Sequence, residues 1–116
     1  MRCAPVVLLG VVAILAAPAR ATWSILAVDT ATGEIAMGSA TCLSQVDVEA
    51  ITPVLLVGKG GGFVQAGISL DDRQIIWDQL KIGTAPADIL ALIAQADPQF
   101  SLRQIAIVDL EGRVAA

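Results

Sequence analysis

The first 21 residues most constrain what this chain can fold into, because they have the three parts of a secretory signal. Arg2 makes the start positive, residues 6–17 form an apolar stretch, and Ala19-Arg20-Ala21 has the small residues that signal peptidase recognises. The apolar stretch is too short to cross a bilayer as a helix. We therefore expect removal of residues 1–21 on export to the periplasm or the extracellular space, leaving one domain of 95 residues that begins at Thr22.

The charge and the cysteine content of residues 22–116 exclude several partners and sites. Five basic residues against eleven acidic ones give a side-chain charge of −6, which argues against nucleic acid or an anionic membrane as a partner. Cys42 is the only cysteine of this segment, so no internal disulfide can form. Three interpretations of it stay open: a small buried hydrophobic residue, a partner for a cysteine outside the segment or, least favoured, a catalytic thiol.

Residues 22–68 predict two β-hairpins joined by a polar, irregular segment. In each hairpin, β-forming residues flank a turn rich in glycine or in Asp and Thr. The first hairpin comprises residues 22–28, 29–33 and 35–41, the second comprises 54–57, a tight turn at 58–62 and 63–68, and residues 42–52 lie between them.

The remaining residues predict two helices followed by a strand. Ser69 caps a helix that ends at Gly83, and Thr84 caps a second helix that Asp97-Pro98 ends. An alternating strand, a turn and the start of a return strand follow at residues 102–109, 110–112 and from 114 onward. Because that return strand is short and leaves edge groups unpaired, we expect the front part of a longer domain.

Several kinds of catalytic and binding site are excluded by residue type. The chain has no histidine, which excludes Ser-His-Asp and Cys-His catalysis and His-containing metal sites. The single cysteine of residues 22–116 excludes a Cys-based zinc site, and we expect no metal and no cofactor. The glycine run lacks the lysine followed by Ser or Thr of a P-loop, and Phe63 replaces the glycine that a dinucleotide fingerprint needs. The acidic residues are scattered in caps and turns.

Nucleophilic catalysis without histidine is still possible at a free N-terminus. The α-amine of an N-terminal threonine can take the proton of its own hydroxyl, and an α-amine titrates just above neutral pH, where a general base is effective. Cleavage after Ala21 would leave Thr22 in that position. Thr22 is therefore the candidate nucleophile, although many exported proteins begin with Thr or Ser for no catalytic reason.

Two long segments resemble a known family when they are taken together. "TWSILAVDTATGEIAMGSAT" is similar to the opening of the Ntn-hydrolase-like family called domain of unknown function 1028. "DDRQIIWDQLKIGTAPADILALIAQADPQFSLRQIAIVDLEGRVAA" follows the same family's order of helices and turns. The resemblance covers most of residues 22–116, and the ordered set is more specific than any one piece.

The resemblance implies an α+β fold, a four-layer αββα sandwich that is incomplete in this chain, with the nucleophile at the start of the front strand. Thr22 matches the family's leading threonine, and the wider superfamily implies hydrolysis of a small-molecule or peptide amide. Backbone N–H groups would then hold the oxyanion. The candidates to border the site are the alternate strand residue Ser24, and Ser39, Lys59, Gly60 and Gly61.

Two departures from the resemblance leave a rival function open. Gly38-Ser39 stands where proteasome-type relatives have an acid, and the supporting lysine has no counterpart other than Lys59, in the glycine turn. The rival is a non-catalytic cell-envelope binding module on the same sandwich, in which Thr22 simply follows the cleavage site and Ser24 is an ordinary strand serine. A third expectation is a chain that does not fold alone.

Overall fold

The computed structural model describes residues 22–116, and the expected secretory signal lies outside the described residues. The strands are β1 (Thr22–Asp29), β2 (Glu34–Thr41), β3 (Pro53–Leu56), β4 (Gly60–Gln65), β5 (Gln104–Asp109) and β6 (Val114–Ala115). The helices are α2 (Val48–Ile51), α3 (Leu70–Ile82) and α4 (Pro86–Ala96), and a 3-10 turn lies at Phe100–Leu102. No helix within residues 22–116 is both long enough and apolar enough to cross a membrane.

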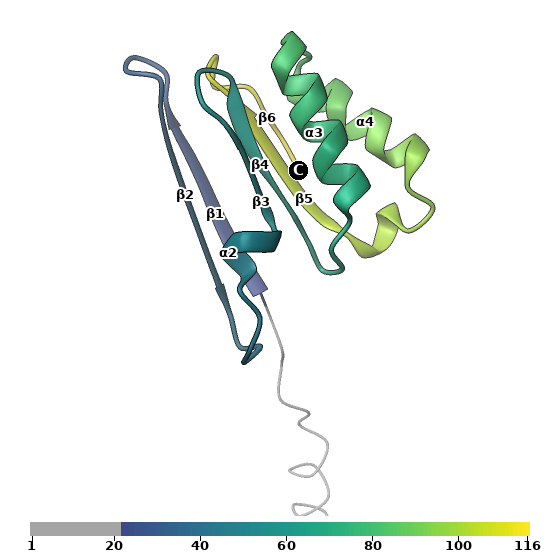
Figure 1. Cartoon of the computed structure of the whole chain (residues 1–116). Coiled ribbons are helices and arrows are strands. Elements are labelled where there is room, and N and C mark those ends of the chain that lie inside the picture. Colours follow the sequence, from purple (N-terminus) through teal and green to yellow (C-terminus); the bar gives the residue numbers. More distant parts are fainter. Residues whose placement is uncertain (1–21) are drawn as a thin grey trace, which may run out of the picture.

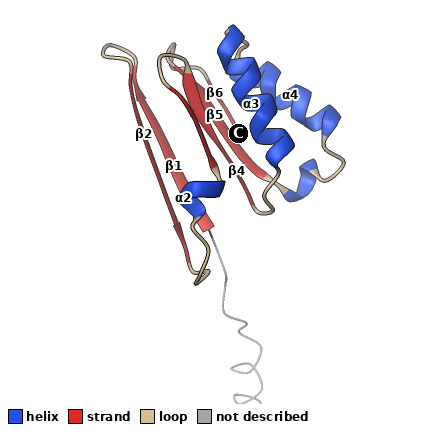
Figure 2. Cartoon of the chain, viewed as in Figure 1, coloured by secondary structure: helices blue, strands red, loops and turns tan. Residues whose placement is uncertain are grey.

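The strands form two antiparallel sheets that stack in layers. The first has the order β1-β2 and the second has the order β3-β4-β5-β6. β1 contacts β4 and β5 across the interface between the sheets, and α3 and α4 cover the opposite face of the larger sheet (Figures 1 and 2). The described residues thus make three layers of a mixed α and β fold, which confirms the coarse fold class. A helix layer outside β1-β2 is absent from them.

The hydrophobic core lies between the larger sheet and the helices. Ile76 of α3 and Ile107 of β5 are completely buried, and α4 contributes Ile89 and Ile93 at the same depth. All four belong to one cluster of buried side chains, which also contains Leu80, Val54, Val64 and Ile105. Burial of this cluster from both sides provides the main driving force for folding.

The first hairpin forms as predicted, and its turn explains its register. Gly33 has a φ of +75° and its N–H donates to the carbonyl of Asp29 at 2.8 Å, a conformation that glycine adopts without strain. The turn pairs Thr22 with Thr41 and Ser24 with Ser39. Successive residues of β1 alternate between half-buried and exposed, as expected for a strand with one covered face.

The glycine run is only partly a turn, which corrects the prediction of a tight turn over residues 58–62. The turn covers residues 57–59 with Gly58 at a φ of +77°, and Gly60–Gly62 are buried inside β4. A Cβ on Gly62 would lie 2.8 Å from the carbonyl oxygen of Ala106, and one on Gly61 would lie 3.3 Å from the sulfur of Met37. These glycines therefore allow the close approach of neighbouring backbone and of the β1-β2 sheet.

The helix boundaries agree with the sequence at three of four ends. The Ser69 hydroxyl accepts a hydrogen bond from the N–H of Asp72 at 3.1 Å, Gly83 adopts the left-handed conformation, and α4 stops at Asp97. The prediction that Thr84 caps α4 is wrong. Pro86 holds the residue before it in an extended conformation, so Ala85 takes the cap position.

Two further predictions for the connecting segments need correction. Residues 42–52 contain the short helix α2, capped by Asp47, whose carboxylate accepts from the N–H of Ala50 at 3.1 Å. Cys42 precedes it and is exposed, so its interpretation as a small buried hydrophobic residue is wrong. The predicted strand 102–109 begins only at Gln104, because Phe100–Leu102 forms a 3-10 turn.

Candidate functional site

Thr22 begins β1 on the face of the hairpin that lies against the larger sheet. Its side chain is half-buried, and its Oγ1 lies 2.9 Å from the Oγ1 of Thr41, the last residue of β2. The two hydroxyls therefore form a cross-strand pair at the open end of the hairpin, where β1 starts in Figure 1.

Ser24 and Ser39 form the next pair along this face. The Ser24 hydroxyl donates to Oε1 of Gln65 on β4 at 2.5 Å, and Nε2 of Gln65 donates to Oε1 of Gln104 on β5 at 3.1 Å. The Oγ of Ser39 is shielded from solvent and has no hydrogen-bond partner within residues 22–116. The hydrogen bonds thus run from the hairpin across to the larger sheet.

These six residues make one polar strip between the sheets, which we call the hydroxyl–glutamine row: Thr22, Ser24, Ser39, Thr41, Gln65 and Gln104. None of its side chains carries a charge at neutral pH. The row can supply a hydroxyl nucleophile and neutral hydrogen-bond donors and acceptors, but no side chain in it is a general base.

A small apolar pocket continues from the row between β2 and β3. It has a volume of about 220 Å³ and is lined by Met37, Gly38, Ser39, Glu49, Pro53, Leu55 and Phe63. Ser39 belongs to both the row and the pocket wall, and Phe63 stands two residues before Gln65 on the same face of β4. The pocket is therefore an extension of the row and not a separate site.

The structure does not bring Lys59, Gly60 and Gly61 to Thr22. Gly60 pairs with Asp109 at one end of β4, whereas Gln65, which contacts Ser24, pairs with Gln104 at the other end. Five residues of strand separate these ends by roughly 17 Å. Of the expected bordering residues, only Ser24 and Ser39 lie beside Thr22.

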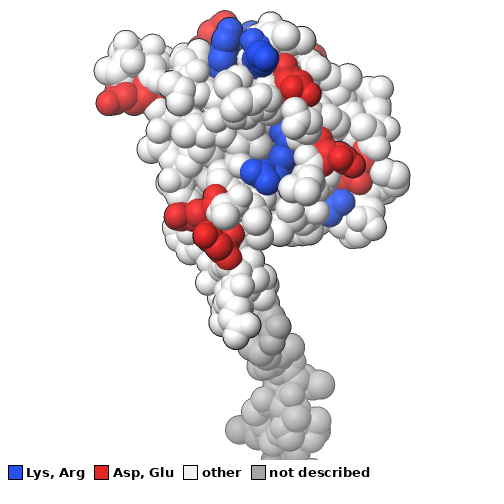
Figure 3. Space-filling view, in the orientation of Figure 1, with Lys and Arg blue, Asp and Glu red and all other residues white. Residues whose placement is uncertain are grey.

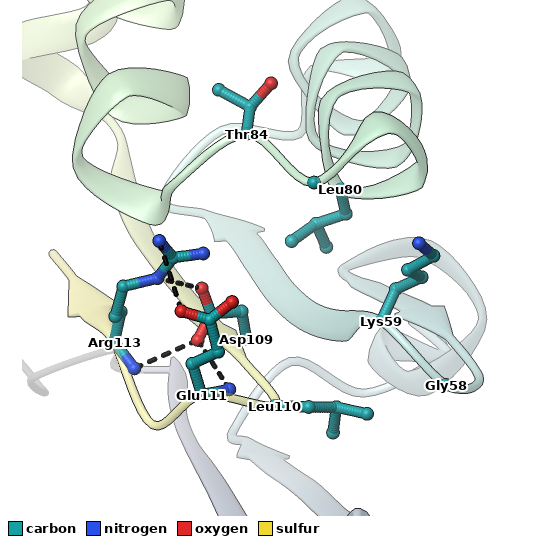
Figure 4. Close-up of a pocket in the computed structure, with 9 residues that line it drawn as sticks. Gly58, Lys59, Leu80, Thr84, Asp109, Leu110, Glu111 and Arg113 are labelled. Carbon is teal, nitrogen blue, oxygen red and sulfur yellow. Dashed lines mark hydrogen bonds and ion pairs between the residues drawn. The ribbon is translucent and has the colours of Figure 1, made fainter.

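The end of the sheet with Lys59 forms a charged pocket of about 200 Å³ (Figure 4). Arg113 Nε donates to Oδ2 of Asp109 at 2.6 Å, and Oδ1 accepts from the N–H groups of Glu111 and Arg113 at 3.0 Å each. The hydrogen bond that Arg113 donates to Asp109 raises the pKa of Arg113. In Figure 3, blue basic and red acidic side chains lie side by side at the top of the molecule, where Figure 1 places the β3-β4 and β5-β6 turns. The buried Asp109 carboxylate thus accepts hydrogen bonds from the backbone N–H groups of the β5-β6 turn.

A third polar cluster joins the start of α3 to the end of α4. Arg103 Nε contacts Oδ2 of Asp97 at 2.8 Å and Oδ2 of Asp72 at 3.9 Å. Burial raises the pKa of Asp72, which is 1% exposed, whereas the hydrogen bond from Arg103 lowers the pKa of Asp97. Within residues 22–116 no three side chains of His, Cys, Asp or Glu group as metal ligands.

Sequence reasoning found only half of the row. Thr22, Ser24 and Ser39 were candidates, whereas Thr41, Gln65 and Gln104 were not expected at the site. Thr41 could have been found from the predicted hairpin, because a turn centred between residues 31 and 32 pairs residue 22 with residue 41. The glutamines come from distant segments, so nothing local marks them.

Together the fold and the row define a layered α and β protein with a neutral, hydroxyl-rich site between its two sheets. The chain belongs to the family of unknown function DUF1028, whose model matches residues 22–116.

Its structure is similar to the crystal structure of a DUF1028 protein from Silicibacter pomeroyi, with 29% sequence identity and a TM-score of 0.67. The match covers 81% of this chain and 43% of that protein, so the chain spans less than half the length of this relative. No curated protein matches the chain.

Proposed function

We propose that this chain is an exported N-terminal-nucleophile hydrolase, or its front part, that cleaves an amide bond with Thr22. The observation that carries the proposal is the Thr22 hydroxyl, which lies at the start of β1 in a row without any basic side chain. If residues 1–21 are removed, the α-amine of Thr22 becomes the base that the row lacks.

In the proposed reaction, Thr22 Oγ1 attacks the carbonyl carbon of the amide. The Thr22 α-amine accepts the hydroxyl proton and passes it to the leaving nitrogen, so that the C–N bond breaks and an ester to Thr22 remains. Water, deprotonated by the same amine, then attacks the ester, releases the carboxylic acid and returns the proton to Oγ1. Thr41, 2.9 Å from Thr22 Oγ1, orients the hydroxyl for this attack.

The tetrahedral intermediate needs hydrogen-bond donors for its oxygen. The Ser39 hydroxyl is shielded from solvent, has no partner within residues 22–116, and lies diagonally across the hairpin from Thr22. Diagonal cross-strand neighbours are about 7–8 Å apart, which leaves room for a carbonyl group between them. Ser39 is therefore proposed as one donor, once a change of its side-chain rotamer turns the hydroxyl towards the substrate, with backbone N–H groups as the others.

The outer face of the β1-β2 sheet supports the four-layer αββα arrangement as part of this proposal. Trp23 is 59% exposed and Ile25 is 60% exposed, and their cross-strand partners Ala40 and Gly38 are also apolar. A soluble protein seldom leaves such a face uncovered. In the proposed sandwich, a second helix layer packs on it.

The test is acylation of the purified exported protein by a β-lactone, followed by mass spectrometry of its peptides. We expect one adduct on Thr22, none in Thr22→Ala, and an unchanged adduct in Thr32→Ala, the matched control in the exposed β1-β2 turn. One extra residue in front of Thr22 should also abolish the adduct, because it removes the free α-amine. Equal labelling of wild type and Thr22→Ala would contradict the proposal.

The second candidate function is a non-catalytic cell-envelope binding module. It is favoured by the absence of any charge in the hydroxyl–glutamine row and by the position of Lys59 at the other end of β4. A protein that carries Thr22 at its N-terminus and yet stays unlabelled by β-lactones would support this alternative.

A further inference from the structure

We infer that the 220 Å³ pocket between β2 and β3 binds the acyl-side substituent of the substrate, and that this substituent is a neutral aliphatic side chain. The inference rests on the proposed function, since it assigns a substrate class to the same site. It turns an unspecified amide into one whose carbonyl side bears an alkyl group of about leucine size.

The position of the pocket places it next to the reacting atoms. Ser39 lines the pocket and stands two residues before Thr41, whose hydroxyl contacts that of Thr22. Two residues of strand span roughly 7 Å. An alkyl substituent on the carbon next to a carbonyl at Thr22 therefore extends towards the pocket.

The size of the pocket fits one side chain and not a whole ligand. Sites for drug-sized molecules have volumes of about 300–1,000 Å³, and this pocket has about 220 Å³. The remainder of the substrate would then lie along the row, where Gln65 and Gln104 supply amide groups for hydrogen bonds.

The lining of the pocket favours an alkyl group over a charged one. Met37, Pro53, Leu55 and Phe63 supply apolar walls, and Glu49 of α2 is the one ionisable lining residue. A carboxylate on the substrate would lose hydration in the pocket and meet the like charge of Glu49. An ammonium group would gain from Glu49 alone, which is exposed and largely screened by solvent.

The Ser39 hydroxyl gives a second reason to expect a ligand here. A buried polar atom without a partner is uncommon, and such atoms often lie where a ligand or a water completes the hydrogen bonding. After a change of the Ser39 side-chain rotamer, an amide group held between the row and the pocket would supply that partner. The free hydroxyl and the apolar walls together thus match a carbonyl group with an alkyl substituent.

The experiment compares the rates at which three β-lactones acylate Thr22. The lactones carry a methyl, an isobutyl or a carboxyethyl group on the carbon next to the carbonyl. We expect the isobutyl compound to react at least about tenfold faster than the methyl compound, as for an added alkyl group in a fitted pocket, and the carboxyethyl compound to react slowest. Leu55→Trp should remove the isobutyl preference, because the larger side chain fills the pocket.

The matched control is Leu92→Trp on α4, where the wild-type side chain is 41% exposed, close to the 45% of Leu55. It should leave all three rates unchanged. Equal rates for the methyl and isobutyl compounds, or the fastest reaction with the carboxyethyl compound, would overturn the inference. Labelling at Thr22 in the same experiment would still support the proposed function.

A separate readout keeps the inference testable if Thr22 is never labelled and the proposed function fails. Met37 is the only methionine within residues 22–116. After removal of residues 1–21, a protein with ¹³C-labelled methionine methyl groups therefore gives one NMR signal, and it comes from the pocket wall. N-acetyl-leucine amide should shift that signal, and N-acetyl-glutamate amide should not. The absence of a shift with either compound would overturn the pocket assignment.

Discussion

The helix-covered sheet and the β1-β2 hairpin differ sharply in how they bury side chains. Every member of the core cluster belongs to β3, β4, β5, α3 or α4, and no residue of β1 or β2 is fully buried. The hairpin instead presents half-buried hydroxyls to the space between the sheets. The comparison indicates that one part of the molecule provides stability, which leaves the other free to carry a polar site.

The largest expected loss of stability comes from a substitution in the core between the larger sheet and the helices. Ile107→Ala removes a completely buried side chain in the centre of β5 and leaves a cavity between the sheet and the helices. We expect the free energy of unfolding to fall by about 2–5 kcal/mol, measured by urea denaturation. A loss below about 1 kcal/mol would show that the core lies elsewhere.

Glycine substitutions sharpen the same comparison with a smaller effect. In Gly62→Ala the new Cβ lies 2.8 Å from the Ala106 carbonyl oxygen and 3.4 Å from Ile76, so overpacking should cost about 1–3 kcal/mol. Gly38→Ala is the matched control on the hairpin, because its Cβ meets only Ile25 at an ordinary 3.5 Å. The control should stay within roughly 1 kcal/mol of wild type. Equal losses in the two variants would contradict this account.

A truncation on the hairpin should cost less than one in the core. Leu26 points from β1 towards the larger sheet and is half-buried. Leu26→Ala should lower the free energy of unfolding by roughly 1 kcal/mol, about half the value of a fully buried leucine. If urea denaturation gave a loss of unfolding free energy equal to that of Ile107→Ala, the hairpin and the helix-covered sheet would contribute equally to stability, against this account.

The smallest predicted effects come from the carboxylates beside Arg103. The pKa of Asp97 is lowered, chiefly by the hydrogen bond from Arg103, so its contribution to stability is present above its unfolded pKa and is lost as the pH falls through the folded value. Asp97→Asn should therefore lower stability at neutral pH and flatten the acid side of the stability profile.

The contribution of Asp72 to stability should depend on pH in the opposite direction, because burial raises the pKa of this carboxyl group. Its contribution to stability is complete below its unfolded pKa and is lost as the pH rises through the raised value. Asp72→Asn should therefore reduce the loss of stability as the pH rises from 4 to 7. Thermal denaturation from pH 2 to pH 7 measures both variants, and parallel profiles of the two would contradict the assignment.

The parts of the fold that the sequence predicted depend on local chemistry. The Asp29–Gly33 turn, the Ser69 cap and the Gly83 helix end each follow from one residue type in one backbone conformation. Gly60–Gly62 could not be assigned in this way, because only the neighbouring strand and α3 reveal why a side chain would not fit there. The exposure of Cys42 likewise depends on tertiary placement.

The residues of the candidate site also fall into two groups, those placed by local structure and those placed by long-range packing. Thr22 and Ser24 share a face through strand alternation, and the turn then determines that Thr41 and Ser39 face them. Gln65 and Gln104 reach the row from β4 and β5 only when the two sheets stack. Long-range packing of this kind leaves no periodic signal in the sequence.

The measurement that tests the central claim most directly is the N-terminal sequence of the protein recovered after export. The proposed hydrolase requires a free α-amine on Thr22, because the hydroxyl–glutamine row holds no other base. We predict that the recovered chain begins Thr-Trp-Ser-Ile-Leu. A recovered chain that begins at any other residue, or one that retains residues 1–21, would contradict the account.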